Sequence, residues 1–552
     1  MQATAGGAPR RAWNRSRGIL TLASALGALV VLMPILAVLL NLLRPASPVW
    51  AHVAGTLIPR YAANTFWLVA GTTAATACLG VGAAWLVATW RFPLRGVVEW
   101  ALILPLAVPT YVLTYAYYEL LAFGGPVQGA LRAAFGLGPG GYWFPNLASL
   151  PGAVFILSLA LYPYVYLAAR AAFLQQSGTV MEVSRTLGCS PTGAFVRVML
   201  PLARPSIAVG LSLVAMESIA DYGAVSLLGV QTFTTGIYKA WFSMGDPVAA
   251  SQLAALLLLG VLALVLLERL SRRGRVANTG ADHHFKGAGA LPPGRGALAL
   301  LACLLPVLLG FVVPALTLLS MLSRIGVEGV DWRFAELAGR SLALALITAL
   351  LAVGLGLLMV YGARIAASPW PRALNRLAAT GYAIPGPVIA IGTLVPLAAF
   401  DNAVDALAER YLGVSTGLLL TGGTTILVLA YLARFMTTSL GAIEAGFAKV
   451  RPSIEDAASI LGAGAFRRLA AVHTPIVWPA LGTALLLVFV DVMKELPATL
   501  ILRPFNFDTL AVRTFNLARD ERIAEAALPA LALVAVGLLP VILLSRRIAR
   551  RG

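Results

Sequence analysis

Long apolar runs separated by short polar segments account for almost the whole sequence. Each run is close to the roughly 20 residues that a helix needs to cross the hydrocarbon core of a bilayer. Backbone groups in lipid must be hydrogen-bonded within the protein, so these runs predict helices and not strands. The twelve predicted spans are 19–43, 64–90, 98–122, 148–172, 205–229, 248–270, 297–323, 340–365, 376–400, 415–440, 479–502 and 525–545. The pattern therefore predicts an all-α polytopic membrane protein.

The polar segments divide the spans into two halves. Segment 271–296 is rich in Gly, Pro and Arg and contains His283 and His284, a composition typical of a solvated linker. We expect both histidines to be solvated and not to bind metal. The predicted parts are a cytoplasmic N-terminal tail (1–18), a first transmembrane half (19–270), a cytoplasmic linker (271–296), a second transmembrane half (297–545) and a cytoplasmic basic tail (546–552).

The two halves are related by an internal repeat. Segments 182–201 and 456–475 each open on an acid, carry a glycine six residues later and end on a proline thirteen residues after that. The copies are 274 residues apart, and upstream the offset becomes 276, where Val-Pro-Thr-Tyr-Val at 108–112 matches Ile-Pro-Gly-Pro-Val at 384–388. Six spans per half place both halves in the membrane in the same sense. We therefore expect two parallel six-helix repeats with the solute pathway at their interface.

Composition and charge support a membrane protein and set its orientation. Of the 552 residues, 59% are hydrophobic and 12% charged, which is too little charge to cover the surface of a soluble chain. The net charge of +18 does not indicate nucleic-acid binding, because the basic clusters flank apolar runs. These clusters are Arg10, Arg11, Arg15 and Arg17, then Arg269, Arg272, Arg273 and Arg275, and finally Arg546, Arg547, Arg550 and Arg551. The positive-inside rule then places both termini, the linker and both repeat loops in the cytoplasm.

The repeat loops themselves have an amphipathic pattern. In the first loop, Phe195, Val198 and Leu202 recur at helical spacing among arginines. Gly188 and Gly462 suit a sharp turn between two short helices, since glycine tolerates a positive φ. Interfacial helices against lipid headgroups are one interpretation, but two such helices have no reason to keep acid, glycine and proline in register. We favour two matching sockets for a cytoplasmic partner.

This spacing resembles the EAA loop of binding-protein-dependent ABC importer permeases. The resemblance implies the type I ABC importer transmembrane fold, with a short coupling helix in each loop that docks on a cytoplasmic ATPase subunit. The residues that it assigns to coupling are Glu182, Gly188 and Pro201 in the first loop, and Asp456, Ala457, Ala458, Gly462 and Pro475 in the second. The first copy departs from the family pattern with Val183 and Ser184 in place of two alanines, and the second opens on Asp and carries His473 and Thr474.

Acidic residues follow each loop within an apolar run. Glu217 and Asp221 match Asp491 and Glu495 at the offset of 274, and Lys494 accompanies the second pair. Four-residue spacing predicts that each acid pair shares one helix face. Ionisable groups at this depth usually face a bundle interior or a water-filled cavity. In one interpretation the acids pair with Lys494 or with arginines elsewhere, or lie where Gly223 and Pro497 break the helix. In the other they form an acidic lining for a cationic solute, or a gate.

The residues around these acids carry a further resemblance. Segments 221–242 and 494–513 are similar to fused two-half ferric-iron permeases of the same family, and the resemblance extends over nearly the whole chain. It implies a permease that receives Fe(III) from a periplasmic or lipid-anchored solute-binding protein and has no metal site of its own. Because Fe(III) prefers oxygen ligands, Tyr222 joins the acids and Lys494 as a candidate pathway or gate residue. Permeases for thiamine, other small cations or phosphonates share the scaffold and form the alternative.

Basic residues after the eleventh span lie on the predicted outer side, against the positive-inside trend. Arg503 and Arg513 are therefore candidate contacts for the binding protein. Local pairing with Asp508, Asp520 and Glu521 is an equally good interpretation, because exposed ion pairs are common and weak.

The chain has no nucleotide-binding loop of the G-x-x-x-x-G-K-[ST] type, and no glycine in it is directly followed by lysine. We expect a permease subunit of the bacterial cytoplasmic membrane that is not an enzyme and holds no cofactor, driven by two copies of a separate ATPase that uses ATP and Mg²⁺. A proton- or sodium-coupled secondary transporter would also use intramembrane acids, but it would not need paired cytoplasmic loops. A membrane enzyme acting on Mg²⁺-pyrophosphate would place clustered aspartates on water-facing loops.

Overall fold

The computed structural model describes residues 7–45, 48, 50, 53–138, 141–176, 186, 188–271, 289–325, 331–366 and 368–549. Within these ranges, regular structure is helical apart from two strands of two residues each. Strands β1 (Trp90–Arg91) and β2 (Gly289–Ala290) pair in parallel, with Trp90 opposite Gly289. The predicted all-α class is confirmed.

Eleven helical runs in the described ranges are long and apolar enough to cross a membrane. They are Gly18–Leu43, Val53–Thr89, Leu150–Gln175, Thr192–Ala220, Pro247–Glu268, Pro293–Arg324, Trp332–Ile365, Gly386–Leu412, Thr425–Phe447, Ala465–Lys494 and Ile523–Leu543. Arg95–Ala107 and Thr110–Phe135 pass the same test together and are bent by 93° at the break between them. Counted as one span, this pair brings the total to the predicted twelve.

Two spans begin earlier than predicted. The elements concerned are α9 (Pro191–Ala194), η4 (Phe195–Met199) and α10 (Leu200–Ala220) and, one repeat later, α21 (Ala465–Arg468), η9 (Leu469–His473) and α22 (Thr474–Lys494). Each set forms one continuous helical run, so the spans start at Thr192 and Ala465 and not at 205 and 479. They end at Ala220 and Lys494 although the apolar sequence continues, because hydropathy does not mark a helix break inside an apolar run.

The helices form two compact units that do not coincide with the two sequence halves. One unit comprises residues 1–45 and 335–509, and the other comprises 46–334 and 510–552. The first span thus packs with helices of the second half, while the C-terminal span packs with helices of the first. The two sequence halves therefore describe the predicted internal repeat, whereas the two units describe how the helices pack.

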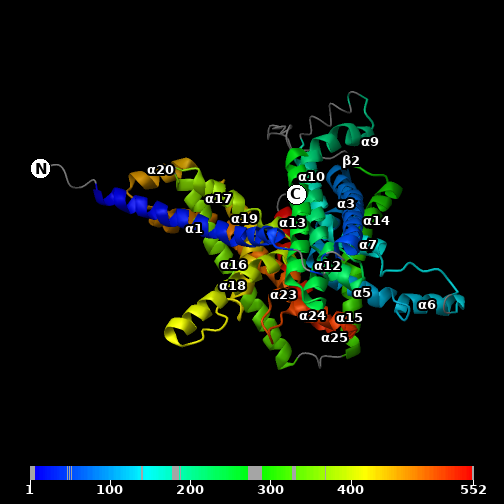
Figure 1. The fold of residues 1–552 in the computed structure, drawn as a ribbon. Coiled ribbons are helices and arrows are strands. Elements are labelled where there is room, and N and C mark those ends of the chain that lie inside the picture. The colour runs from blue at the N-terminus through cyan, green and yellow to red at the C-terminus, as the bar shows by residue number, and fades with distance from the viewer. Residues whose placement is uncertain are drawn as a thin grey trace. The chain divides into compact units, whose positions relative to one another are not determined.

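The unit of residues 1–45 and 335–509 contains the second repeat loop. Its helices are α1 (Gly7–Leu40), η1 (Asn41–Leu43), α16 (Trp332–Ile365), α17 (Trp370–Ala378), η8 (Gly381–Ala383), α18 (Gly386–Leu412), α19 (Thr425–Phe447), α20 (Pro452–Ile460), α21, η9, α22 and α23 (Pro497–Leu502). Helix α1 packs against α17, α18 and α19, and α19 packs along α22 (Figure 1). A Cβ at Gly392 would lie 2.3 Å from the Pro34 carbonyl oxygen, so glycine permits the close approach of α18 to α1.

The unit of residues 46–334 and 510–552 contains the first repeat loop. Its helices are η2 (Val53–Leu57), α3 (Ile58–Thr89), α4 (Arg95–Ala101), η3 (Leu104–Ala107), α5 (Thr110–Leu121), α6 (Pro126–Phe135), α7 (Leu150–Gln175), α9, η4, α10, α11 (Gly223–Leu227), α12 (Phe233–Tyr238), η5 (Lys239–Ser243), α13 (Pro247–Ser271), α14 (Pro293–Val307), η6 (Leu308–Val312), α15 (Val313–Ile325), α24 (Leu510–Arg519) and α25 (Ile523–Ala549). Helices α3 and α7 run side by side (Figure 1), and α25 packs against α15 and α24. A Cβ at Gly80 would lie 2.9 Å from the backbone nitrogen of Tyr166, which explains the small residue in this contact.

Candidate functional site

The second repeat loop forms a short helix followed by a turn. Asp456, Ala457 and Ala458 lie on α20, where Asp456 and Ala457 are exposed and Ala458 is buried. Gly462 has a φ of +72°, a conformation that residues with a side chain rarely adopt. The chain then enters α21 and the long run that includes α22. The predicted short helix and glycine turn are confirmed for this loop, but the second helix is wrong as a short helix, because α21 is the start of the long run Ala465–Lys494.

The end of helix α20 exposes two large apolar side chains. Ile460 is 87% exposed and Leu461 is 84% exposed, and both precede the turn at Gly462. Adjacent apolar side chains at the tip of a loop leave a surface that another protein can cover. Neither residue could be predicted as a contact from the sequence, because an isoleucine and a leucine among many apolar residues carry no distinctive pattern.

The described part of the first repeat loop matches the second. Gly188 has a φ of +79°, and Pro201 is the second residue of α10, as Pro475 is the second residue of α22. Each proline follows a π-helical segment, η4 or η9, inside its continuous run, and such an irregular turn accommodates the missing N–H of proline. Glu182 lies outside the described residues. The part that can be compared therefore follows the predicted repeat.

Asp221 lies at a helix break and not on the helix. Helix α10 ends at Ala220, and the Asp221 carboxylate accepts hydrogen bonds from the backbone nitrogens of Ala224 (3.0 Å) and Val225 (3.1 Å) in the first turns of α11. The Thr110 hydroxyl donates a third bond to the same carboxylate at 2.6 Å. A side-chain acid that receives amide hydrogens in this way caps a helix N-terminus. The prediction that the first acid pair shares one helix face is therefore wrong.

Glu495 occupies the equivalent break in the second half. Helix α22 ends at Lys494, and the Glu495 carboxylate accepts from the backbone nitrogens of Ala498 (2.8 Å) and Thr499 (3.0 Å) in α23. The Arg434 guanidinium, on α19, donates to it at 3.0 Å. Asp221 and Glu495, which are related by the predicted offset, thus both cap the short helix that follows them. The prediction that Asp491 and Glu495 share one helix face is therefore also wrong. An arginine elsewhere in the chain was one of the expected partners of the acids, and Arg434 is that residue for Glu495.

The helix starts beside the two breaks are also related by the repeat. Thr110 opens α5 and Gly386 opens α18, and these positions correspond at the offset of 276. A Cβ at Gly386 would lie 2.6 Å from Arg434 Nη1 and 3.0 Å from Glu495 Oε1. The Thr499 hydroxyl also donates to the Glu495 carboxylate at 2.5 Å, so both acids accept from a hydroxyl. The second half differs by having a glycine at the Thr110 position, which leaves room for the guanidinium.

The remaining intramembrane candidates lie on the long helices. Glu217 is half-buried on α10 and takes part in no hydrogen bond or ion pair within the described residues. Asp491 and Lys494 lie three residues apart on α22 and attract one another electrostatically. Tyr222 follows the first break, and its ring stacks on that of Tyr238 with 3.6 Å between centroids. Glu217 is thus the least compensated of the predicted pathway acids.

The arginines after the second break divide between paired and exposed positions. Arg503 forms an ion pair with Asp508, one of the local partners considered from the sequence. Arg513 is exposed on α24. Arg522 pairs with Glu525, so its charge is also partly compensated. The role of Arg503 and Arg513 in binding-protein contact stays a prediction.

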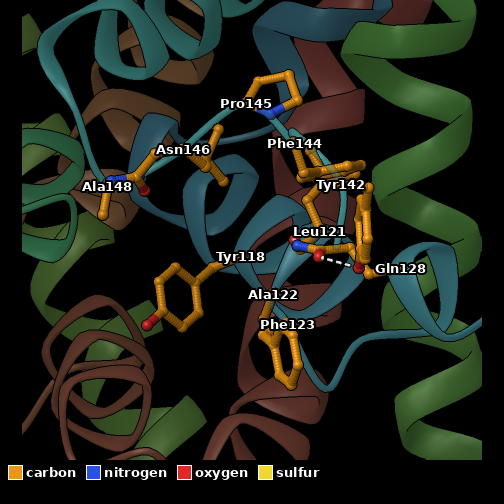
Figure 2. A pocket seen from close by; sticks show the side chains of 11 residues that line it. Tyr118, Leu121, Ala122, Phe123, Gln128, Tyr142, Phe144, Pro145, Asn146 and Ala148 are labelled. Atoms are coloured by element: carbon orange, nitrogen blue, oxygen red, sulfur yellow. Dashed lines mark hydrogen bonds between the residues drawn. The ribbon is translucent and has the colours of Figure 1, made fainter. Parts of the chain in front are cut away.

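A cavity of about 360 Å³ lies in the arm that follows α5 (Figure 2). The Gln128 side chain donates to the Leu121 carbonyl at 2.8 Å and accepts from the Tyr142 hydroxyl at 2.7 Å. Phe123, Phe144 and the Tyr142 ring add aromatic surface, and none of the lining residues is charged. Within the described residues, no group of three or more His, Cys, Asp or Glu side chains could hold a metal ion. The lining is therefore uncharged, but the Arg132 guanidinium is in contact with it and donates to the Tyr142 hydroxyl at 3.0 Å. No sequence pattern had indicated this cavity.

Comparison with known proteins decides the family. Residues 76–276, which include the first repeat loop, match the family described as binding-protein-dependent transport system inner membrane component. The chain is 32% identical over 167 residues to the molybdenum transport system permease protein ModB of Azotobacter vinelandii, a match covering 30% of this chain and 70% of that protein. The chain belongs to the family of binding-protein-dependent inner-membrane transport components.

Two relatives of this permease match both of its halves. The Fe(3+)-transport system permease protein FbpB 2 of Haemophilus influenzae is 26% identical over 494 residues, which cover 88% of this chain and 89% of the relative. The probable ABC transporter permease protein y4fN of Sinorhizobium fredii is 25% identical over 515 residues, covering 88% and 87%. The resemblance to fused two-half permeases is therefore confirmed.

Family membership confirms the general role predicted for the chain. Such permeases are multi-pass inner-membrane proteins that work with a solute-binding protein and an ATPase and are not themselves enzymes. The two repeat loops and the two capped breaks are accordingly parts of a transport protein. The individual roles predicted for Gly188, Gly462, Glu217 and the other site residues are not assigned by the comparisons.

Proposed function

We propose that this chain is the permease of an ATP-driven importer that carries ferric iron delivered by a solute-binding protein. The observation that carries the proposal is the similarity to the Fe(3+)-transport permease FbpB 2 over nearly the full length of both chains. The similarity to ModB of Azotobacter vinelandii, in contrast, covers 30% of this chain. A relative that shares both halves is the better guide to a pathway to which both halves contribute.

The intramembrane acids support a cationic cargo. Asp221 and Glu495 are occupied as helix caps, so we assign them to the gate. Glu217, with no ion-pair partner within the described residues, is the carboxylate that we assign to transient contact with the cargo. Asp491 is partly compensated by Lys494. A carboxylate without a counter-charge attracts a cation and repels a phosphonate, which favours iron over the 2-aminoethylphosphonate named for another partial relative.

The repeat loops support coupling to a separate motor. We assign one copy of the ATPase to each loop, with α20 and the exposed Ile460 and Leu461 as the contact in the second loop. ATP binding draws the two loops together, the pathway opens outward and the binding protein releases its cargo. Hydrolysis of ATP by the partner, with Mg²⁺, then restores the inward-facing state. This orientation requires both termini and the linker to be cytoplasmic, as the basic clusters favour.

Uptake in reconstituted vesicles tests the proposal. The permease is inserted with its ATPase, and the binding protein loaded with radioactive ferric iron is added outside. We expect iron to accumulate only when ATP is present inside. Uptake without the ATPase would refute the ABC permease role, and ATP-driven uptake of thiamine or 2-aminoethylphosphonate in place of iron would refute the substrate assignment.

A further inference from the structure

One arginine joins three helices beside the second repeat loop. Arg364 lies at the end of α16, and its Nε donates to the carboxylate of Glu455 in the first turn of α20. Its Nη1 donates to the Phe447 carbonyl at 2.7 Å, and its Nη2 donates to the Val450 carbonyl at 2.7 Å. Phe447 is the last residue of α19, and its carbonyl also accepts from the Val450 backbone nitrogen at 3.0 Å, so the guanidinium adds a second bond at this helix end. A single side chain therefore ties α16 to both α19 and α20.

Neighbouring contacts fix the same end of α16 to the far side of the loop. The Tyr361 hydroxyl donates to the Ala465 carbonyl, the first residue of α21, at 2.8 Å. His473 Nε2 lies 3.6 Å from Glu455 Oε1 and is almost fully buried. The Arg364 and Glu455 side chains are 22% and 23% exposed, which limits screening of their attraction by water and salt. The last turns of α16 thus hold the loop on both sides of the turn at Gly462.

We infer that Arg364 is a positioning residue that transmits the movement of α20 into α16. The inference rests on the proposed docking of an ATPase on α20. A coupling helix attached only through its flanking chain would shift without moving a span, whereas one bonded to α16 carries the span with it. The guanidinium suits this role because its planar fork reaches a carboxylate and two carbonyls at once, which a lysine ammonium cannot reproduce.

A second pair on the same helix provides a matched control. Arg340 and Glu336 form an ion pair within α16, with side chains 43% and 38% exposed. Arg340 is roughly 36 Å along the helix from Arg364, at 1.5 Å per residue. Loss of this exposed pair removes the same type of interaction without touching the repeat loop.

The experiment measures iron taken up per ATP hydrolysed in vesicles that contain the permease, its ATPase and the iron-loaded binding protein. For Arg364→Gln we expect unchanged co-purification of the ATPase and at least about a fivefold fall in iron per ATP, the lower end of usual coupling between sites. Arg364→Lys, which keeps the charge beside Glu455, is expected to recover part of this loss. Arg340→Gln is expected to leave the ratio unchanged. If Arg364→Gln does not insert, Glu455→Gln carries the same expectation.

The possible outcomes separate this inference from the proposed function. A normal ratio of iron to ATP in Arg364→Gln overturns the inference. An equal loss of ATPase attachment and uptake also overturns it, because Arg364 would then build only the docking surface. Failure of the unchanged permease to bind the ATPase refutes the proposed function instead. A lowered ratio with the ATPase still attached supports both.

Discussion

The buried pair of Arg434 and Glu495 allows a quantitative test of the second break. The Glu495 side chain is 1% exposed and that of Arg434 is 12% exposed, so both charges are largely withdrawn from solvent. Removing one partner of a buried ion pair costs about 3–5 kcal/mol, because the other charge is left uncompensated. Glu495 would retain the two backbone donors of α23, at Ala498 and Thr499. We therefore expect Arg434→Met to lower the free energy of unfolding by about 3 kcal/mol, at the lower end of that range.

Thermal unfolding of the purified permease in detergent checks this value. Arg340→Met is the control, because an exposed pair contributes only about 0–1 kcal/mol. The midpoint should fall clearly more for Arg434→Met than for the control, and adding Glu495→Gln to Arg434→Met should recover part of the loss by removing the stranded charge. Equal midpoints for the two single variants would refute the assignment of Arg434 as the counter-charge of the break.

Three further predictions concern the loops and the pathway. In the double variant Gly188→Val and Gly462→Val, each valine is forced into a positive φ, at a cost of about 1–3 kcal/mol each. We expect the protein to insert but to lose co-purification of the ATPase. Undiminished co-purification would count against the role of the two loops as sockets. The double variant Ile460→Ser and Leu461→Ser should bind the ATPase about 30-fold more weakly, which corresponds to the ~2 kcal/mol of an interface hot spot. A pull-down titration with the purified ATPase measures this change. Glu217→Gln should reduce iron uptake in vesicles while the unfolding midpoint stays unchanged, and unaltered uptake would remove Glu217 from the pathway.

The sequence predicted the features that depend on local residue type. Gly188 and Gly462 were expected to form turns because glycine adopts a positive φ without steric cost, and both do so. The offset of 274 predicted that Asp221 and Glu495 are equivalent, and both cap a short helix. These predictions succeeded because a turn and a cap are fixed by a few neighbouring residues, which a repeat preserves together.

Features that depend on distant residues could not be predicted in this way. Arg434 is 61 positions from Glu495, and Arg364 is 91 positions from Glu455. Neither arginine belongs to a motif, and only the packing of α19 and α16 brings them to their partners. Span ends at the two breaks were also missed, because a run of apolar residues has the same hydropathy whether or not the helix stops within it.

The two breaks show why a repeat can locate an acid without identifying its counter-charge. The first-half counterpart of Arg434 is Ala160 at the offset of 274 and Ser158 at the upstream offset of 276, and neither buried residue carries a charge that could pair with Asp221. The first half instead supplies the hydroxyl of Thr110, and the second half has Gly386 at that place, where any larger residue would meet the guanidinium. Each set of groups compensates its own carboxylate. A larger residue at Gly386 alone would clash with the guanidinium, and loss of Arg434 alone would leave Glu495 without its counter-charge. The two halves therefore share the backbone break and its carboxylate cap but differ in the groups that compensate the acid.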